Sequence, residues 1–301
     1  RRGLGLLGGR ARATGENDPR ATESLRRARE AHESGRREEA ATLYRHILQT
    51  WPAHPDALRG LRDLAIDAAD WDAAVAVQER LIDVARPAAR AAEAEWLAVA
   101  YYELGRLELA RGAAAAALGH LRAAVRADRS FLPAAIALGD AHEAAGERRE
   151  AVRAWERAAE AWPALPLLAR LERAYRLEGR PSRMISLYRD AAARAPDDLA
   201  LAAALGRVYF ELEMLDEAAD QFEKLEVRAP DLAVVHAYLG AVFERRGDLR
   251  DALEEYRRAL RLGHAFDWPH LCEACGAAAA SWQDRCPGCH RWNTLRPAPG
   301  R

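Results

Sequence analysis

The sequence predicts an all-α protein built from repeated antiparallel helix pairs, followed by a small cysteine-rich module. Three observations lead to this prediction. Half of the 301 residues are hydrophobic, and alanine, leucine, glutamate and arginine, all strong helix formers, dominate the chain. A set of small, aromatic and proline positions returns about every 34 residues. All 4 cysteines lie near the C-terminus. The formal net charge of −1 does not indicate a globally basic nucleic-acid-binding protein.

Residues 1–20 are predicted to be a flexible leader. They begin with Arg1-Arg2 and end in the turn-rich segment Thr14–Arg20, and no stretch of the chain reaches the ~20 apolar residues of a membrane span. One interpretation is that these residues are the cytoplasmic flank of a removed transmembrane helix, because arginines favour the cytoplasmic side of such a helix. A clipped signal peptide, with Ala11-Arg12-Ala13 as its cleavage site, and a disordered leader are the alternatives.

The repeated unit has a small residue at position 8, Gly at 15, Ala at 20, an aromatic at 24 and Pro at 32. In one unit these positions hold Gly139, Gly146, Ala151, Trp155 and Pro163. The small residues allow two antiparallel helices to approach closely, and the aromatic side chain fills the space beside them. Glycine suits the turn between the helices, and proline ends the second helix. The units start at Ala21, Pro55, Ala98, Leu132, Leu165, Leu199 and Ala233.

This period and these positions are those of the tetratricopeptide repeat. No single unit buries its apolar face alone, so about seven helix pairs are expected to stack into a superhelix over residues 21–266. The step from Pro55 to Ala98 is nine residues too long, with the surplus around Arg86–Arg90. We expect a longer second helix or a longer connection there, either as a bend in the array or as a neutral insertion.

The first helix of each pair is expected to line a concave groove. Arginine recurs at position 9 of four units, and arginine forks pair bidentately with carboxylates. The groove is therefore predicted to bind an extended or helical peptide with acidic groups, the alternative being a solvated groove in an arginine-rich protein. The candidate groove residues are Arg29, Tyr102, Arg106, Asp140, Arg173, Arg176, Arg207, Phe210 and Arg245.

The four cysteines form two Cys-x2-Cys pairs, Cys272/Cys275 and Cys286/Cys289, separated by ten residues. Two such knuckles place four sulfurs tetrahedrally around a metal ion, and we predict Zn²⁺ with iron as the alternative. Gly276 permits a tight turn after the first pair, and Pro287-Gly288 shapes the second. Disulfides, which four cysteines can form in three pairings, are the alternative. A module this short has almost no core, so its metal must hold it folded.

Three tryptophans flank the cysteines: Trp268, Trp282 and Trp292. We predict that they dock the module, residues 267–301, against the last repeat. The nearby His270 and His290 are interpreted as bystanders, because the four cysteines already complete a ligand set.

At this point the chain resembles the lipopolysaccharide assembly protein B family, which joins tetratricopeptide repeats to a C-terminal rubredoxin-like domain. The resemblance lies in Cys272-x2-Cys275-Gly276, the ten-residue spacing, Cys286-Pro287-x-Cys289 and then Trp292-x-Thr294-x-Arg296-Pro297. The family has a tryptophan just before the third cysteine. Here Gln283-Asp284-Arg285 occupies that place and Trp282 lies earlier, so docking of the module is expected to differ in detail.

The resemblance implies a non-enzymatic regulatory adaptor at the cytoplasmic side of the bacterial inner membrane, held by a single N-terminal anchor absent from this chain. Such adaptors work with an FtsH-type membrane protease to promote degradation of the deacetylase that commits precursor to lipid A. An inner-membrane lipopolysaccharide sensor antagonises them. The implied partners are therefore proteins, without nucleic acid or a small-molecule substrate, and homodimer formation is left open.

Two other classes remain as alternatives, a generic protein-binding scaffold with a zinc-ribbon docking module and an iron redox protein. Residues 264–301 lack the dense basic cluster with interleaved aromatics that single-stranded nucleic acid requires. A hydrolase has no support, because the sequence contains no nucleophile motif, P-loop or HExxH.

Overall fold

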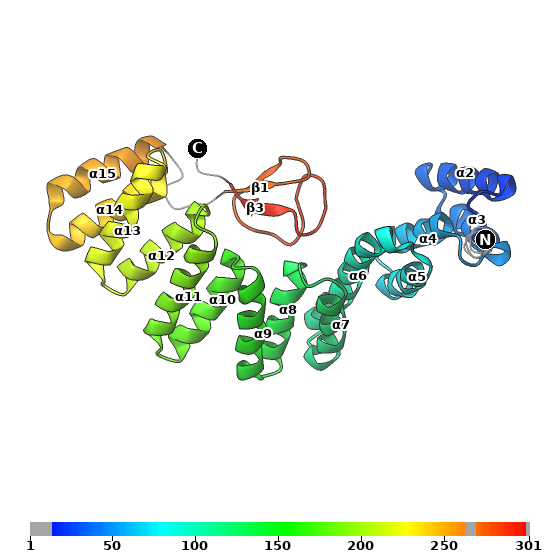
Figure 1. The fold of residues 1–301 in the computed structure, drawn as a ribbon, viewed down its shortest axis with the longest axis horizontal. Coiled ribbons are helices and arrows are strands. Elements are labelled where there is room, and N and C mark those ends of the chain that lie inside the picture. The colour runs from blue at the N-terminus through cyan, green and yellow to red at the C-terminus, as the bar shows by residue number, and fades with distance from the viewer. Residues whose placement is uncertain (1–13, 263–268, 299–301) are drawn as a thin grey trace, which may run out of the picture. The chain divides into compact units, whose positions relative to one another are not determined.

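The computed structural model describes residues 14–262 and 269–298, which divide between Gly146 and Glu147 into two compact units, unit 1 before this point and unit 2 after it. The described residues contain fourteen α-helices, one short 3-10 helix and three short strands (Figure 1). The predicted class, all-α repeats with a small C-terminal module, is confirmed.

The helices follow one another as seven pairs. The first helix of each pair begins at or within two residues of the predicted start in every pair but one, and every second helix has 14 residues. In unit 1 the helices are α2 (Pro19–Glu33), α3 (Arg37–Thr50), α4 (Pro55–Asp67), α5 (Trp71–Val84), α6 (Arg90–Ala110), α7 (Ala114–Ala127) and α8 (Leu132–Ala144). In unit 2 they are α9 (Arg148–Ala161), α10 (Leu165–Leu177), α11 (Pro181–Arg194), α12 (Leu199–Glu211), α13 (Leu215–Arg228), α14 (Ala233–Arg246) and α15 (Leu249–Leu262).

The irregular step between the second and third pairs lies in the first helix of the third pair. Helix α5 ends at Val84 and keeps the common length, so the expectation of a longer second helix is wrong. The surplus residues instead form η1 (Pro87–Ala89) and the first turns of α6, which has 21 residues and starts at Arg90. Pro87 explains the break, because its ring ends one helix and suits the first turn of the next.

The turn inside each pair uses a left-handed residue at position 15. Five of these residues are glycines, among them Gly35 and Gly179, and the other two are Ala69 and Glu213, with φ of 54° and 58°. The N–H of the next residue closes the turn, as in the 2.9 Å bond from the Arg180 N–H to the Tyr175 carbonyl. This is the usual C-terminal cap of a helix, and it reverses the chain into the second helix.

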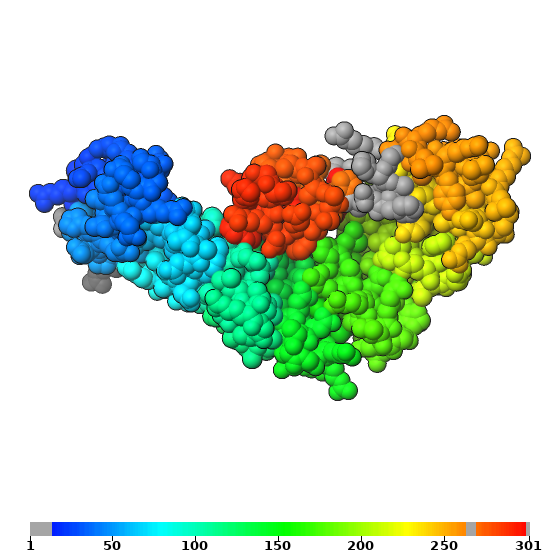
Figure 2. All heavy atoms as spheres, turned by 180° about the vertical axis from the view of Figure 1, so that it is seen from behind, coloured from blue at the N-terminus to red at the C-terminus, as the bar shows by residue number. Residues whose placement is uncertain are grey.

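Within each unit, the core between the two helices of a pair is built around positions 8 and 24. At Gly206 a Cβ atom would lie 2.7 Å from the Phe222 ring, so only glycine lets α12 approach α13 this closely. Phe222 is fully buried and stacks on Tyr238 of α14 with 5.0 Å between ring centroids. In the space-filling view the atoms of α10 to α13, green to yellow-green, form a continuous surface (Figure 2).

The last residues of the predicted leader make specific contacts in unit 1. The Asp18 side chain accepts a hydrogen bond of 2.8 Å from the Arg20 N–H and caps α2, as aspartates commonly do at helix starts. Glu16 forms an ion pair with Arg86. Residues 1–13 of the leader lie outside the described residues. Among the helices within residues 14–262, none combines the length and apolar character needed to cross a membrane.

The C-terminal module of unit 2 is a three-stranded antiparallel sheet with short loops. Its strands are β1 (His270–Cys272), β2 (Ala278–Ala279) and β3 (Leu295–Pro297), in the order β2-β1-β3. His270 faces both Ala279 and Pro297 in the strand register. Among the described residues of the module, the hydrophobic core consists of Cys272, Ala279, Cys286 and Leu295 with a few partly buried neighbours, and the His270 side chain is also buried.

Candidate metal centre and charged clusters

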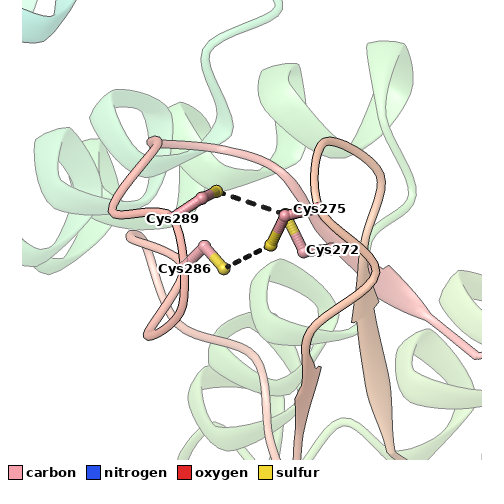
Figure 3. Close-up of side chains that lie close together, drawn as sticks. All are labelled: Cys272, Cys275, Cys286 and Cys289. Carbon is pink, nitrogen blue, oxygen red and sulfur yellow. Dashed lines mark hydrogen bonds between the residues drawn. The ribbon is translucent and has the colours of Figure 1, made fainter.

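The four cysteines converge from two loops onto one point (Figure 3). Their sulfur atoms all lie within 4.8 Å of one another, and the Cys272–Cys289 and Cys275–Cys286 sulfur distances are both 3.7 Å. Four sulfurs at ~2.3 Å from a central zinc ion would be separated by about 3.8 Å. Disulfide sulfurs lie about 2.05 Å apart, and all four thiols are free. The arrangement is therefore a rubredoxin-like metal site.

The two knuckles have the same backbone hydrogen bonds. In the first, the Cys272 N–H donates to the Ala277 carbonyl at 2.9 Å and the Gly276 N–H donates to the Cys272 carbonyl at 2.8 Å. In the second, the Cys286 N–H donates to the Arg291 carbonyl at 2.9 Å, and the His290 N–H donates to the Cys286 carbonyl at 3.0 Å. Gly276 and His290 both have positive φ, 73° and 58°. The sequence predicts the glycine but not its histidine counterpart.

Polar groups around the sulfurs favour thiolates at some positions and oppose them at others. Cys272 and Thr294 side chains share a hydrogen bond of 3.2 Å, which lowers the pKa of Cys272. Backbone N–H groups, including that of Gly288 at 3.3 Å, lower the pKa of Cys286. At Cys275 a backbone N–H favours the thiolate, but burial and the neighbouring cysteines raise the pKa. Four thiolates this close repel one another, so the donor set fits a cation that binds soft sulfur ligands.

The histidines and tryptophans near the cysteines have different surroundings. The cysteine cluster includes neither His270 nor His290, and His290 is exposed. Trp282 packs against the small core of the module, and Trp292 lies under the Arg285 guanidinium at 4.4 Å from the ring centroid. Trp268 lies outside the described residues. The docking role of the three tryptophans stays a prediction.

Most of the arginines predicted to line the groove pair with carboxylates of this chain. Arg29 lies 3.0 Å from Asp56, Arg106 lies 2.7 Å from Glu103, and Arg245 pairs with Glu213 and covers the Phe210 ring. Tyr102 is buried and packs edge-on against Phe131 at 5.5 Å between centroids, so its assignment to an open groove is wrong. Asp140 is half-buried and Arg173 is exposed.

Two repeats carry a charged residue at position 8, where the others have glycine or alanine. In unit 1 this residue is Arg62, with a side chain only 8% exposed. The position 24 residue, Gln78, accepts a hydrogen bond of 3.3 Å from Arg62 and donates one of 2.8 Å to Glu93. Glu93 lies on the extra turns of α6 and also pairs with Arg59 at 2.8 Å. The nine-residue surplus therefore provides the carboxylate that compensates a buried arginine.

In unit 2 the position 8 residue is Glu172, whose side chain is 9% exposed. The position 24 residue, Tyr188, donates a hydrogen bond of 2.6 Å to Glu172. Arg176 and Arg207 lie 2.8 and 2.6 Å from the same carboxylate. Burial alone would raise the pKa of Glu172, but hydrogen bonds from Arg207, Tyr188 and Arg176 outweigh it and lower the pKa to about 2. Glu172 is thus a permanent anion at neutral pH.

Sequence reasoning did not identify Arg62, Gln78, Glu93 or Glu172, although a signal exists. A charged residue at position 8 interrupts the repeat pattern, and a hydrogen-bonding residue, Gln78 or Tyr188, stands at position 24 of the same repeat. A buried charge requires such a partner.

Comparison with protein families agrees with both parts of the structure. Residues 270–297 match a rubredoxin metal binding domain, the zinc ribbon of the lipopolysaccharide assembly protein B family. Residues 31–95 and 167–202 match two models of the tetratricopeptide repeat. The repeats and the metal module are therefore recognised independently of each other.

Several solved tetratricopeptide structures are similar to part of this chain. YrrB, described as a tetratricopeptide protein with an unusual peptide-binding site, is 21% identical, with 55% of this chain and 86% of that chain covered and a TM-score of 0.39. MamA from Desulfovibrio magneticus RS-1 is 22% identical over 56% of this chain and 97% of its own, with a TM-score of 0.40. With tetratricopeptide repeats followed by that family's own metal-binding domain, the chain has the domain composition of the lipopolysaccharide assembly protein B family.

Proposed function

We propose that this protein is a non-enzymatic adaptor that regulates lipid A synthesis by promoting proteolysis of the committed deacetylase through a membrane-bound FtsH-type protease. One observation carries the proposal. The rubredoxin metal binding domain that matches residues 270–297 is that of the lipopolysaccharide assembly protein B family, and it follows tetratricopeptide repeats in the same chain. Such repeats bind proteins, which is the coarser function that an adaptor needs.

In this proposal the repeats, residues 21–266, bind one protein partner and the module, residues 267–301, presents a second surface or closes the last repeat. The exposed groove arginines, such as Arg173 and Arg176, are the candidate contacts for acidic groups of the partner. Trp282 and Trp292 are the candidate docking residues of the module. The inner-membrane lipopolysaccharide sensor is the proposed antagonist, and the proposed location is the cytoplasmic side of the inner membrane.

We further propose Zn²⁺ as the native metal, held by Cys272, Cys275, Cys286 and Cys289. The small core of the module supports a structural ion, and zinc has no redox chemistry of its own. Metal analysis of the purified protein should give about one zinc per chain in a colourless solution. A red protein whose colour is reversibly bleached by a reductant would show that the bound metal is iron and not zinc.

The function is tested by measuring the half-life of the deacetylase after protein synthesis is stopped. Deleting the gene should lengthen the half-life, and the wild-type gene should restore it. The Cys286→Ser variant should fail to restore it if the metal module is required. Gln283→Ser, an exposed substitution in the same loop, is the matched control and should restore turnover fully. An unchanged half-life in the deletion strain would reject the adaptor and leave a scaffold of another pathway.

A further inference from the structure

Two arginines in unit 2 are arranged to bind a carboxylate, and a carboxylate of this chain already lies between them. Arg176, near the end of α10, and Arg207, on α12, both donate to the Glu211 side chain, Arg207 at 2.7 Å. Two guanidinium groups that share one carboxylate are a strong and geometrically specific anion site.

The two arginines are held in place by Glu172 on their buried side. Its carboxylate lies 2.8 Å from Arg176 and 2.6 Å from Arg207, and the Tyr188 hydroxyl fixes it with a further bond of 2.6 Å. Because these partners are fixed before a ligand arrives, binding costs little ordering of the arginine side chains. Glu172 neutralises one of the two guanidinium charges, so the pair retains a positive charge for a second carboxylate.

Glu211 supplies this second carboxylate, and a carboxylate of a ligand could replace it. It is the last residue of α12, where the negative end of the helix dipole disfavours a carboxylate. Its side chain is 31% exposed, and Arg176 is 44% exposed. Ion pairs at such exposed positions stabilise proteins by only about 0–1 kcal/mol. An incoming carboxylate that makes additional contacts can therefore compete with Glu211.

Space for such contacts exists beside the arginines. A cavity of about 420 Å³ is lined by Arg176 and Arg207 together with Ala169 and Leu177, and Leu177 is 72% exposed. A large exposed leucine beside an anion site suits a ligand that carries an apolar side chain next to its acidic one. Arg176 and Arg207 come from two successive repeats, share the Glu211 carboxylate and both line this cavity, as Arg173 does.

We propose that Arg176 and Arg207 form a carboxylate clamp for an acidic, leucine-containing segment of a protein partner, and that Glu211 is an internal competitor which the partner displaces. The proposal rests on the proposed adaptor function and specifies its ligand chemistry. The proposal predicts that removing the negatively charged side chain of Glu211 strengthens the binding of a negatively charged ligand.

The test is fluorescence anisotropy with the full purified chain and a fluorescein-labelled peptide of sequence Gly-Leu-Glu-Leu-Glu-Gly. The peptide with both glutamates replaced by glutamine is the ligand control. Glu211→Gln should lower the dissociation constant roughly fivefold, the factor that corresponds to the upper range of an exposed ion pair. Glu217→Gln removes the same charge at an exposed position on α13 and should leave the dissociation constant unchanged.

Arg176→Gln should raise the dissociation constant by about tenfold or more, because the ligand loses a charge-assisted contact. Arg176 is exposed and Glu172 keeps Arg207 and Tyr188, so this variant should fold, which helical circular dichroism checks. The double variant Arg176→Gln/Glu211→Gln should show no gain over Arg176→Gln.

Equal effects of Glu211→Gln and Glu217→Gln would overturn the clamp in favour of overall charge. Absence of binding by both wild type and Glu211→Gln, or wild-type affinity in Arg176→Gln, would also overturn it. These results concern a purified chain and a peptide, so they are independent of deacetylase turnover. A failed clamp leaves the adaptor standing, and unchanged turnover leaves the clamp as a site for a different protein.

Discussion

The repeats and the metal module reach a fixed structure by different physical means. The repeats bury large side chains, with Tyr44, Trp155, Tyr188 and Phe222 each at most 2% exposed. The hydrophobic core of the described module consists of two cysteines, one alanine and one leucine. Packing in the repeats is distributed over many neighbours, whereas so small a core is expected to need a metal ion at the four cysteines. The same chain therefore offers a matched comparison between a core made by side chains and a core made by a metal.

Removing the metal should have the largest effect and should separate the two regions. A chelator should unfold the module, because structural zinc contributes on the order of 10 kcal/mol in small metal domains. The helical circular dichroism signal should remain nearly unchanged, because the described residues of the module contain no helix. Limited proteolysis should cut after residue 268 only when the metal is removed. Loss of the helical signal at the same chelator concentration would contradict this separation.

Glu93→Ala should produce the largest effect inside the repeats. It removes the buried carboxylate that Arg62 and Gln78 share and leaves Arg62 with Asp63 at 2.7 Å. Breaking a buried ion cluster costs up to about 3–5 kcal/mol. Thermal unfolding of unit 1 should shift down accordingly, while zinc content stays constant. Glu95→Ala, an exposed change on the same helix, is the control and should stay within about 0.5 kcal/mol of wild type. Equal effects of both variants would show that the buried cluster is not needed.

Acid should weaken unit 2 through Glu172. Its folded pKa of about 2 lies below the ordinary value of 4.5, so the ionised form stabilises the folded state above pH 4.5 and that contribution is lost as pH falls towards 2. The shift corresponds to about 3 kcal/mol. The stability difference between wild type and Glu172→Gln should therefore shrink over this range in denaturant titrations. A difference that does not depend on pH would contradict the assignment.

Gly206→Ala should have the smallest effect, and whether it stabilises or destabilises the protein tests the close packing of α12 against α13. Alanine favours a helix over glycine by about 1 kcal/mol, but here its Cβ would meet the Phe222 ring. Such overpacking costs about 1–3 kcal/mol, so the net change should be destabilising in thermal unfolding, and Phe222→Leu in the same chain should relieve it. At Gly119 on α7 no atom lies within 4 Å of the new Cβ. Gly119→Ala should therefore be stabilising, and the same sign at both sites would refute the packing argument.

The sequence predicts the repeats well because their rules are local. The period, the position 15 turn and the helix starts, such as Leu132 and Leu199, follow from small, aromatic and proline residues at fixed spacing. The four metal ligands are predicted for the same reason, since Cys272/Cys275 and Cys286/Cys289 carry their geometry in their spacing.

The charged contacts could not be predicted in the same way. Arginines at equivalent positions, such as Arg106 and Arg207, pair with different partners, because one partner comes from a neighbouring turn of the same helix and the other from the preceding repeat. The nine-residue surplus was visible, but its placement depends on Pro87, which starts a new helical segment rather than prolonging α5. Tyr102 was misplaced because helix periodicity gives a face, whereas the depth of burial depends on Phe131 from the following pair.

The extra turns of α6 have a consequence for how this protein can change over time. Repeat proteins gain, lose and exchange whole units because each unit fits its neighbours by the same rules. Arg62 and Glu93 belong to different repeats, and they pair with each other where both are buried. Exchanging one repeat without the other would remove Glu93 from Arg59 and Arg62, and would leave Arg62 with Asp63 alone. The second and third repeats are therefore expected to tolerate exchange only as a pair.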